Sequence, residues 1–209
     1  MIQNSKKAFL LLLLTSTVTF AQLEPKIDVL GTIFGMPVIK AEYLINDDIG
    51  VELSYNFRYG KPFFKDDNSI KQSGGGIKIE PRFYLSSYEG GDGYYVGLYI
   101  RKQSIFYEYK GEYYSQDNEL IEYTYSNNHK FSSLGFVVGY KYFFDSGITI
   151  ELGTGIGRML SNEYTTDRKS DDFFGSDDDF SNFDFFGTFG VGYRFDWGIN
   201  EEESGVDEF

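Results

Sequence analysis

The stretch that most constrains the fold is residues 77–85, IKIEPRFYL, in which apolar and polar side chains alternate. Alternate positions form an apolar set (Ile77, Ile79, Pro81, Phe83, Leu85) and a polar set (Lys78, Glu80, Arg82, Tyr84). Successive side chains of a β-strand point to opposite faces, so this strand has one apolar and one polar face. Residues 49–59 repeat the pattern. Such strands need an apolar medium on one side and polar partners on the other. This predicts a closed β-barrel in a membrane, apolar outside and ionic inside.

The first 21 residues have the three parts of a secretory signal peptide. Lys6 and Lys7 supply the positive region, residues 8–14 are apolar, and Ala21 offers a small residue for cleavage. We expect the mature chain to begin at Gln22. The alternative is a transmembrane anchor, but the apolar run is shorter than the ~20 residues that a spanning helix needs. The chain has no cysteine, which excludes a lipoprotein anchor and disulfide bonds.

The charge balance argues against nucleic acid as a partner. The chain has 19 Lys and Arg residues, and removal of Lys6 and Lys7 leaves 17 against 32 Asp and Glu, a net charge of −15. Phosphate backbones are bound by basic surfaces, so no nucleic-acid partner is expected.

Eight segments have the alternation or composition of strands, and their connections differ in length. The expected strands are 26–34, 38–45, 49–59, 76–85, 94–109, 131–144, 148–160 and 183–197. The connections at 46–48, 86–93 and 145–147 are short, whereas those at 60–75, 110–130 and 161–182 are long. Bacterial outer-membrane barrels have short periplasmic turns and long external loops. The prediction is an all-β, eight-stranded antiparallel up-and-down transmembrane barrel over residues 22–197. It follows signal peptide 1–21 and precedes an acidic periplasmic tail, 198–209.

Parity along each strand assigns side chains to the interior or the exterior. The expected inward set mixes both charges with polar groups: Lys40, Glu42, Glu52, Asn56, Arg58, Lys78, Glu80, Arg82, Tyr99, Arg101, Lys141, Glu151 and Arg194. Buried charges are tolerated when they are paired, and eight strands leave an interior that side chains just fill. The outward set is apolar, with Tyr43, Tyr55, Tyr94, Tyr140, Tyr142, Tyr193 and Trp197 as candidates for aromatic girdles. A water-filled pore is therefore not expected.

Two positions are expected to disturb the regular ladder. Pro81 has no N–H group to donate, which predicts a bulge or local distortion. Around Lys102–Ile105 the alternation of polarity slips, which also predicts a bulge.

A signal peptide, eight alternating strands and unequal connections resemble the small outer-membrane β-barrel proteins of the OmpX/OmpA type. The likeness covers residues 27–197, and its sharpest local match is residues 188–195, TFGVGYRF. This stretch looks like the β-signal that those proteins present to the barrel-assembly machinery. In that family the last aromatic is usually the chain terminus, whereas here residues 196–209 follow. The resemblance implies the outer membrane of a Gram-negative bacterium, with outer-membrane lipids, lipopolysaccharide and the assembly machinery as partners.

A secreted lipocalin-like ligand-binding barrel is the alternative fold, because it has the same period with the faces reversed. The glycines decide between the two. Gly153, Gly155 and Gly157 share a face with the charged residues, which suits a crowded interior better than a solvated exterior. The chain also lacks the Gly-x-Trp start and terminal helix of lipocalins.

His129, the only histidine, is the candidate for catalysis. Some barrel enzymes modify lipid A with a histidine and a serine near the outer rim, and such chemistry needs a base hydrogen-bonded to a hydroxyl. His129 and Ser132 are three residues apart, so in a strand they face opposite sides. We therefore expect no catalysis, and a lipid-modifying enzyme using His129 remains the alternative.

The long connections offer three other candidate sites. Residues 171–179, DDFFGSDDD, are rich in carboxylates of the kind that bind Ca²⁺, although the spacing matches no EF-hand loop and a solvated acidic loop is preferred. Residues 107–125 predict a tyrosine-rich hairpin that projects from the membrane, with its tyrosines either packed on one another or exposed to a partner strand. Lys102 and Arg158, at outer strand ends, are expected to meet lipopolysaccharide phosphates or to reach the interface.

We therefore expect a non-enzymatic outer-membrane barrel with a side-chain-filled interior. Its role would be in the envelope or in surface binding through external loops 110–130 and 161–182. No catalytic, cofactor-binding or metal-binding residue is assigned.

Overall fold

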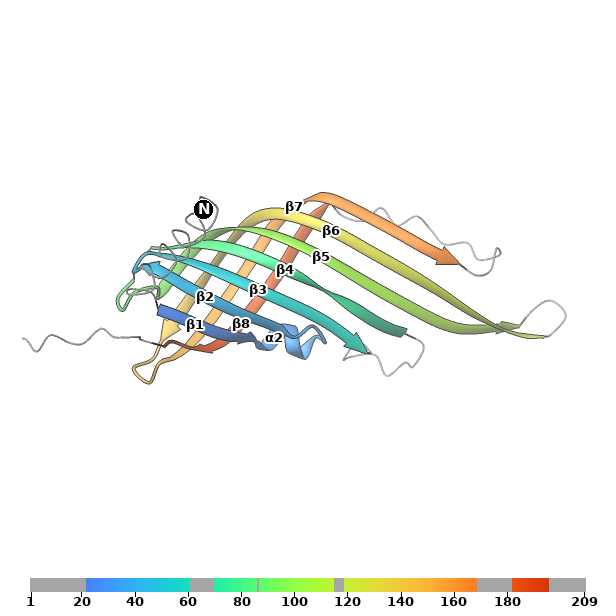
Figure 1. Cartoon of the computed structure of the whole chain (residues 1–209), viewed down its shortest axis with the longest axis horizontal. Coiled ribbons are helices and arrows are strands. Elements are labelled where there is room, and N and C mark those ends of the chain that lie inside the picture. Colours follow the sequence, from blue (N-terminus) through green and yellow to red (C-terminus); the bar gives the residue numbers. More distant parts are fainter. Residues whose placement is uncertain (1–21, 61–69, 86, 115–118, 169–181, 196–209) are drawn as a thin grey trace, which may run out of the picture.

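The computed structural model describes residues 22–60, 70–85, 87–114, 119–168 and 182–195. They form a closed ring of antiparallel strands in chain order, in which β8 returns to pair with β1 (Figure 1). The strands are β1 (Gln22–Asp28), β2 (Val38–Asn46), β3 (Ile49–Gly60), β4 (Ile70–Tyr84), β5 (Gly93–Tyr114), β6 (Leu120–Phe143), β7 (Ile148–Arg168) and β8 (Phe183–Tyr193). The predicted eight-stranded up-and-down barrel is confirmed.

The two faces of the wall have the expected chemistry. In β4, Glu80 and Arg82 are 0 % and 2 % exposed, whereas Ile77, Ile79 and Phe83 are 45–50 % exposed. Every residue of the predicted inward set is buried or half-buried, and Val96, Leu98, Ile100, Phe136 and Leu152 are at least 40 % exposed. The exposed apolar belt therefore surrounds a polar interior, as lipid on the outside requires.

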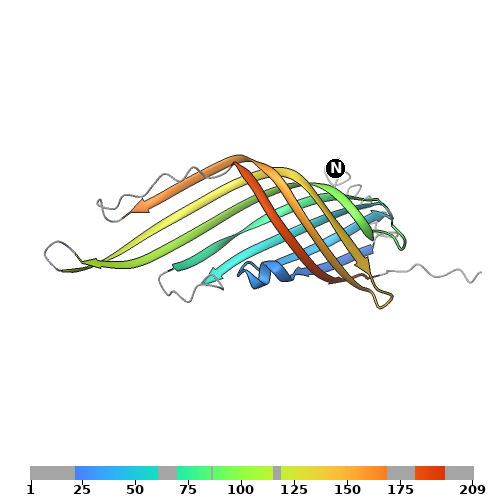
Figure 2. The ribbon, with the colours of Figure 1, turned by 180° about the vertical axis from the view of Figure 1, so that it is seen from behind.

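The ends of the barrel differ. Short turns join β2 to β3, β4 to β5 and β6 to β7 at the end that also holds the start of β1 and the end of β8, here called the turn end. At the opposite end, here called the loop end, β5 and β6 extend well beyond the other strands as one hairpin (Figures 1 and 2). The strand ends at Gly60, Ile70, Arg168 and Phe183 also lie at this end. At the turn end the Tyr94 and Tyr140 rings lie 4.8 Å apart, at a position suited to an aromatic girdle.

The first strand differs most from its prediction. The expected strand 26–34 is instead β1, which begins at Gln22 and stops at Asp28, followed by the short helix α2 (Val29–Ile33). The Asp28 carboxylate accepts a hydrogen bond from the Gly31 backbone N–H, so it caps the helix and ends the strand. As a result, β1 and β8 share only the three residue pairs from Lys26↔Gly192 to Asp28↔Gly190. Beyond these pairs α2 lies against β8 (Figure 2).

The bulges are not where the sequence predicts them. The register of β5 against both neighbours is constant through Lys102–Ile105, so a bulge there is wrong. Ile105 faces inward with the polar side chains. An apolar residue at an inward position interrupts the alternation of polar and apolar residues in the sequence, although the strand itself is regular. The shifts occur instead at Ile45 in β2 and at Leu160 in β7. At Pro81 the β4–β5 pairs are interrupted between Ile79 and Arg82 without a change of register, a local distortion that follows from the missing N–H.

Several predicted features lie outside the described residues: signal peptide 1–21, Trp197 and the tail 198–209. Strand β8 ends at Tyr193, four residues before the predicted Trp197, and one isolated bridge continues the pairing from Leu23 to Phe195. No helix among the described residues is long and apolar enough to cross a membrane.

Candidate functional site

The interior of the barrel holds a cluster of ion pairs, here called the plug. Seven acidic and seven basic side chains pair with one another: Glu24, Asp28, Glu42, Glu52, Glu80, Glu151 and Asp184 with Lys26, Lys40, Lys78, Arg82, Arg101, Lys141 and Arg194. Except for Arg101, at 15 %, these side chains are at most 9 % exposed. Their formal charges cancel, and such neutrality is what allows so many ionised groups to stay out of water.

Lys26 lies at the centre of three carboxylates. Its Nζ atom is 2.5 Å from Glu42, 3.0 Å from Glu52 and 2.7 Å from Glu151, and all four side chains are fully buried. These three glutamates are close enough together to resemble a metal site. The ammonium group of Lys26 occupies the position that a cation would take. The arrangement is therefore that of an ion-pair network.

Arg82 connects the same carboxylates from the other side. Its guanidinium group is 2.6 Å from Glu151, 2.7 Å from Glu80, 2.9 Å from Glu52 and 3.2 Å from Glu42. The predicted pairing of Glu80 with Arg82 inside the barrel is confirmed. The planar guanidinium fork presents several N–H donors at once, which explains why an arginine stands where four carboxylates converge.

The sequence interpretation missed four members of the plug: Glu24, Lys26, Asp28 and Asp184. Near the turn end, Glu24 lies 2.8 Å from Lys141 and 2.5 Å from Arg194. Three of the missed residues belong to β1, whose bounds were misplaced and whose side chains were not assigned to a face. The signal available in the sequence was the alternation of Glu24, Lys26 and Asp28 with Leu23, Pro25 and Ile27.

Tyrosines complete the filling of the barrel. Tyr84, Tyr95 and Tyr99 are no more than 1 % exposed, and the Arg82 guanidinium stacks 4.4 Å from the Tyr95 ring centroid. A Cβ atom at Gly153 would come within 2.6 Å of the Tyr95 hydroxyl, and one at Gly157 within 2.4 Å of the Tyr99 hydroxyl. The inward glycines, which have no side chain, therefore leave the space that the tyrosine side chains occupy.

Above the plug, at the loop end, lies a chamber of about 490 Å³. Its polar wall includes Lys40, Arg58, Lys78, Arg101 and Gln103. Its apolar wall comes from the barrel and from the α2 region: Leu30, Phe34, Met36, Ile105, Phe131, Met159, Phe183, Phe185 and Phe186. The plug closes this chamber toward the turn end.

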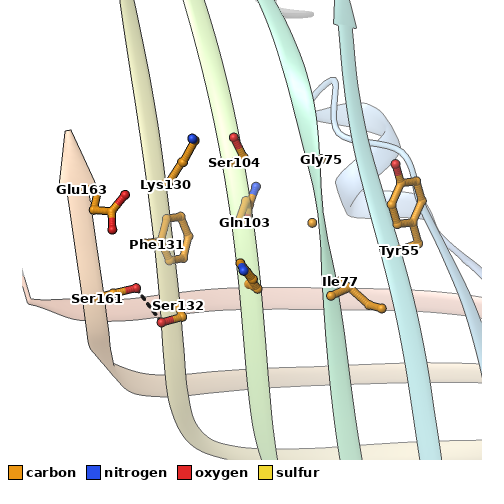
Figure 3. A pocket seen from close by; sticks show the side chains of 12 residues that line it. Tyr55, Gly75, Ile77, Gln103, Ser104, Lys130, Phe131, Ser132, Ser161 and Glu163 are labelled. Carbon is orange, nitrogen blue, oxygen red and sulfur yellow. Dashed lines mark hydrogen bonds between the residues drawn. The ribbon is translucent and has the colours of Figure 1, made fainter. Parts of the chain in front are cut away.

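A second hollow of about 680 Å³ lies on the outer wall, here called the outer groove (Figure 3). It extends across the outer face from β3 to β7, just beyond the apolar belt. Gly75, which has no side chain, lines it. Lys102 faces Ser132 across the β5–β6 pair, and Ser104 faces Lys130. The two lysines are diagonal neighbours, close enough for both to approach one ligand. Ser132 and Ser161 share a hydrogen bond of 2.7 Å in the same groove.

His129 and Ser132 are on opposite faces of β6, as predicted. His129 lines the inner chamber, and its Nε2 atom is 2.7 Å from the Asn162 side-chain oxygen. Ser132 lines the outer groove and pairs with Ser161. The two side chains are therefore not brought together as a nucleophile and base.

The predicted projecting hairpin is present, and its pairing is continuous out to Tyr114↔Leu120. The Tyr109 and Tyr125 rings stack with centroids 4.5 Å apart and an angle of 7° between their planes. Tyr107 and Tyr123 extend this row on either side. These tyrosines pack on one another, the simpler of the two interpretations of the hairpin. The candidate calcium loop 171–179 lies outside the described residues.

A closed ring of eight strands with an ionic interior and an apolar outer belt defines the class of small transmembrane β-barrels of the outer-membrane type. The chain belongs to this class by its own topology.

No family model matches the chain, and no curated protein sequence matches it. Among solved structures, the chain is similar to Acinetobacter baumannii CarO, with a TM-score of 0.46 and 10 % identity, over 87 % of this chain and 99 % of that one. It is also similar to the N-terminal β-barrel domain of Pseudomonas aeruginosa OprF, with a TM-score of 0.34 and 13 % identity, over 84 % and 96 % of the two chains. Both TM-scores are low, so the fold class rests on the closed strand order of this chain.

Proposed function

We propose that this protein is a non-enzymatic, non-conducting barrel of the Gram-negative outer membrane that serves the envelope through contacts of its outer wall and external loops. The observation that carries the proposal is the neutral, buried plug. An aqueous path would have to pass Lys26, Arg82 and Glu151, whose side chains are fully buried against one another. The separation of His129 from Ser132 supports the absence of catalysis.

Conductance in planar lipid bilayers tests this proposal. The wild-type barrel is expected to give no stepwise ion current. The double variant Arg82→Ala/Glu151→Ala removes two long side chains of opposite charge, keeps the plug neutral and is expected to conduct. As a control, heat-dependent gel mobility measures the folded fraction of each protein, so that a current can be assigned to a folded barrel. Steady current steps from the wild-type barrel would contradict a closed interior.

The outer groove supports a more specific part of the proposal, namely that lipid phosphates of the outer leaflet bind there. Lys102 and Lys130 supply positive charge, Ser104, Ser132 and Ser161 supply hydroxyl donors, and one carboxylate, Glu163, lies across from Lys130 and leaves the groove with a net charge of +1. The groove lies directly beyond outward residues such as Ile100 and Leu134, at the level where an apolar belt meets polar headgroups. Lipopolysaccharide carries phosphates at this depth, so the lysines and the lipid are chemically complementary.

Thermal stabilisation by added lipopolysaccharide tests the groove. We expect the wild-type protein in detergent to gain thermal stability, and the Lys102→Met/Lys130→Met variant to lose most of that gain. The matched control is Lys71→Met/Lys110→Met, which removes the same charge from exposed positions outside the groove. Equal loss in both double variants would mean that net charge, rather than this site, attracts the lipid.

A further inference from the structure

Among the residues that the structure describes, the inner chamber has one cation more than the neighbouring acids can neutralise. Arg101 pairs with Asp184, Lys40 with Asp28, and Lys78 with Glu80. Arg58 makes no ion pair with any residue that the structure describes, and its Nη1 atom donates a hydrogen bond of 2.9 Å to the Tyr107 hydroxyl. Arg58 therefore brings a positive charge into the chamber above a plug that is already neutral.

Unused hydrogen-bond donors lie in the same wall. Within the part of the chain that the structure describes, the Nε atoms of Arg58 and Arg101 are buried and have no hydrogen-bond partner. Both residues line the chamber. A buried guanidinium N–H without an acceptor loses the hydration it would have in water, so an oxygen anion in the chamber would recover that loss.

Apolar and aromatic side chains also line the chamber, next to these cations. The rings of Phe131 and Phe186 lie under the Arg101 guanidinium, at 5.2 Å and 5.5 Å from it. Phe34 and Met36, from the segment around α2, line the chamber where β1 has ended and β8 continues without β1 beside it. The chamber thus presents cationic donors beside apolar surface.

We propose that the chamber is a binding site for a small amphipathic carboxylate, a ligand with one anionic head and an apolar or aromatic body. The carboxylate would accept hydrogen bonds from Arg58 and Arg101, and the body would lie against Phe131, Phe186 and the α2 side. The plug beneath makes the site blind-ended, so the ligand binds without passing through the barrel. This site is distinct from the outer groove, because Arg58 and Arg101 line the chamber alone and Lys102 and Lys130 line the groove alone, although Gln103 and Phe131 line both.

Isothermal titration calorimetry of the folded barrel in lipid nanodiscs tests this site with 2-naphthoate as the probe. The neutral isostere 2-naphthamide has the same aromatic body without the charge. We expect saturable binding of one naphthoate per chain, and binding of the amide weaker by at least about tenfold, as for loss of a charge-assisted hydrogen bond. Arg58→Met is expected to weaken naphthoate binding by a similar factor.

Two further variants make the test specific. Ile105→Trp keeps every charge but fills part of the chamber, and it is expected to weaken naphthoate binding. Lys71→Met removes a positive charge from the exposed face of β4 and is expected to leave binding unchanged. Each variant is compared only after its heat-dependent gel mobility shows a folded barrel.

Three results would overturn the proposal. The first is no saturable binding of naphthoate by the wild-type barrel. The second is equal binding of naphthoate and naphthamide, or naphthoate binding that survives Arg58→Met. The third is binding that is seen only after deletion of residues 61–69 or 169–181, which would show that this chain fills the chamber itself.

Discussion

At the scale of single residues, the protein depends on compensating each buried charge. Glu151 illustrates this, because its carboxylate lies 2.7 Å from Lys26, 3.2 Å from Lys40 and 2.6 Å from Arg82, with no exposure to solvent. Desolvation makes each of these ions costly alone, and their mutual attraction offsets that cost. The same side chains that fill the barrel therefore make it sensitive to loss of any one partner.

Glu151→Gln is expected to lower stability strongly, because an amide cannot neutralise the three cations around it. Loss of one partner from a buried pair typically costs ~3–5 kcal/mol. The control is Glu108→Gln, whose Lys110 partner is 3.8 Å away and exposed. That change should cost no more than ~1 kcal/mol. Urea-unfolding midpoints of the refolded proteins measure both, and equal shifts would contradict the burial of the plug.

Gly153→Ala is expected to destabilise the barrel by ~1–3 kcal/mol, because the added methyl group would overlap the Tyr95 hydroxyl. Tyr95→Phe removes that oxygen, so the Gly153→Ala/Tyr95→Phe double variant should recover much of the loss. Gly157→Ala, which meets Tyr99 and the Leu134 carbonyl instead, should not be rescued by Tyr95→Phe. A double-mutant cycle on unfolding free energies checks this, and additive effects at Gly153 would argue against the contact.

At the scale of elements, the seam between β1 and β8 is the weakest part of the ring. Only three residue pairs close it, followed by the isolated Leu23↔Phe195 bridge at the turn end. The Phe195 ring packs 4.9 Å from the Tyr193 ring on the outer face. Unpaired backbone groups in hydrocarbon cost several kcal/mol each, so the few contacts at this seam matter for insertion.

Phe195→Ala is expected to reduce insertion into the outer membrane, because this residue anchors the last strand and completes the stretch that resembles the β-signal. Deletion of residues 198–209 is expected to leave insertion nearly intact. The folded, heat-modifiable fraction in outer-membrane preparations measures both. Should the deletion abolish the barrel while Phe195→Ala keeps it, Phe209 rather than Phe195 would close the signal.

At the scale of the whole molecule, the two ends have different lengths of strand and connection. Strand β6 has 24 residues and β2 has 9, so the barrel wall is longer on the side of β6 than on the side of β2. The unequal connections predict that the loop end faces the outside of the cell and the turn end faces the periplasm.

An epitope inserted within residues 115–118 is therefore expected to bind antibody on intact cells, whereas one inserted within 145–147 should bind only after the outer membrane is opened. Short inserts at connections are tolerated better than inserts in strands, so both proteins should fold. Antibody labelling before and after permeabilisation measures the orientation. Labelling of 145–147 on intact cells would reverse it.

The local pattern of the sequence determined the strands and their faces, because alternation reports at each residue whether a side chain meets lipid or the interior. The inward positions of Lys40, Glu80, Arg82 and Glu151 could be predicted for this reason. Connection lengths likewise predicted an up-and-down order with unlike ends.

Only the tertiary structure decided which charges meet. Lys26 and Glu151 are 125 residues apart and become partners only when β8 closes on β1 at one particular register. The chamber beside α2 also exists only in the closed barrel, because it lies where β8 extends past the end of β1. A strand pattern with a period of two residues specifies the face of each side chain, but neither its neighbours around the ring nor their depth. Those depend on strand register and tilt, which the closed barrel sets as a whole.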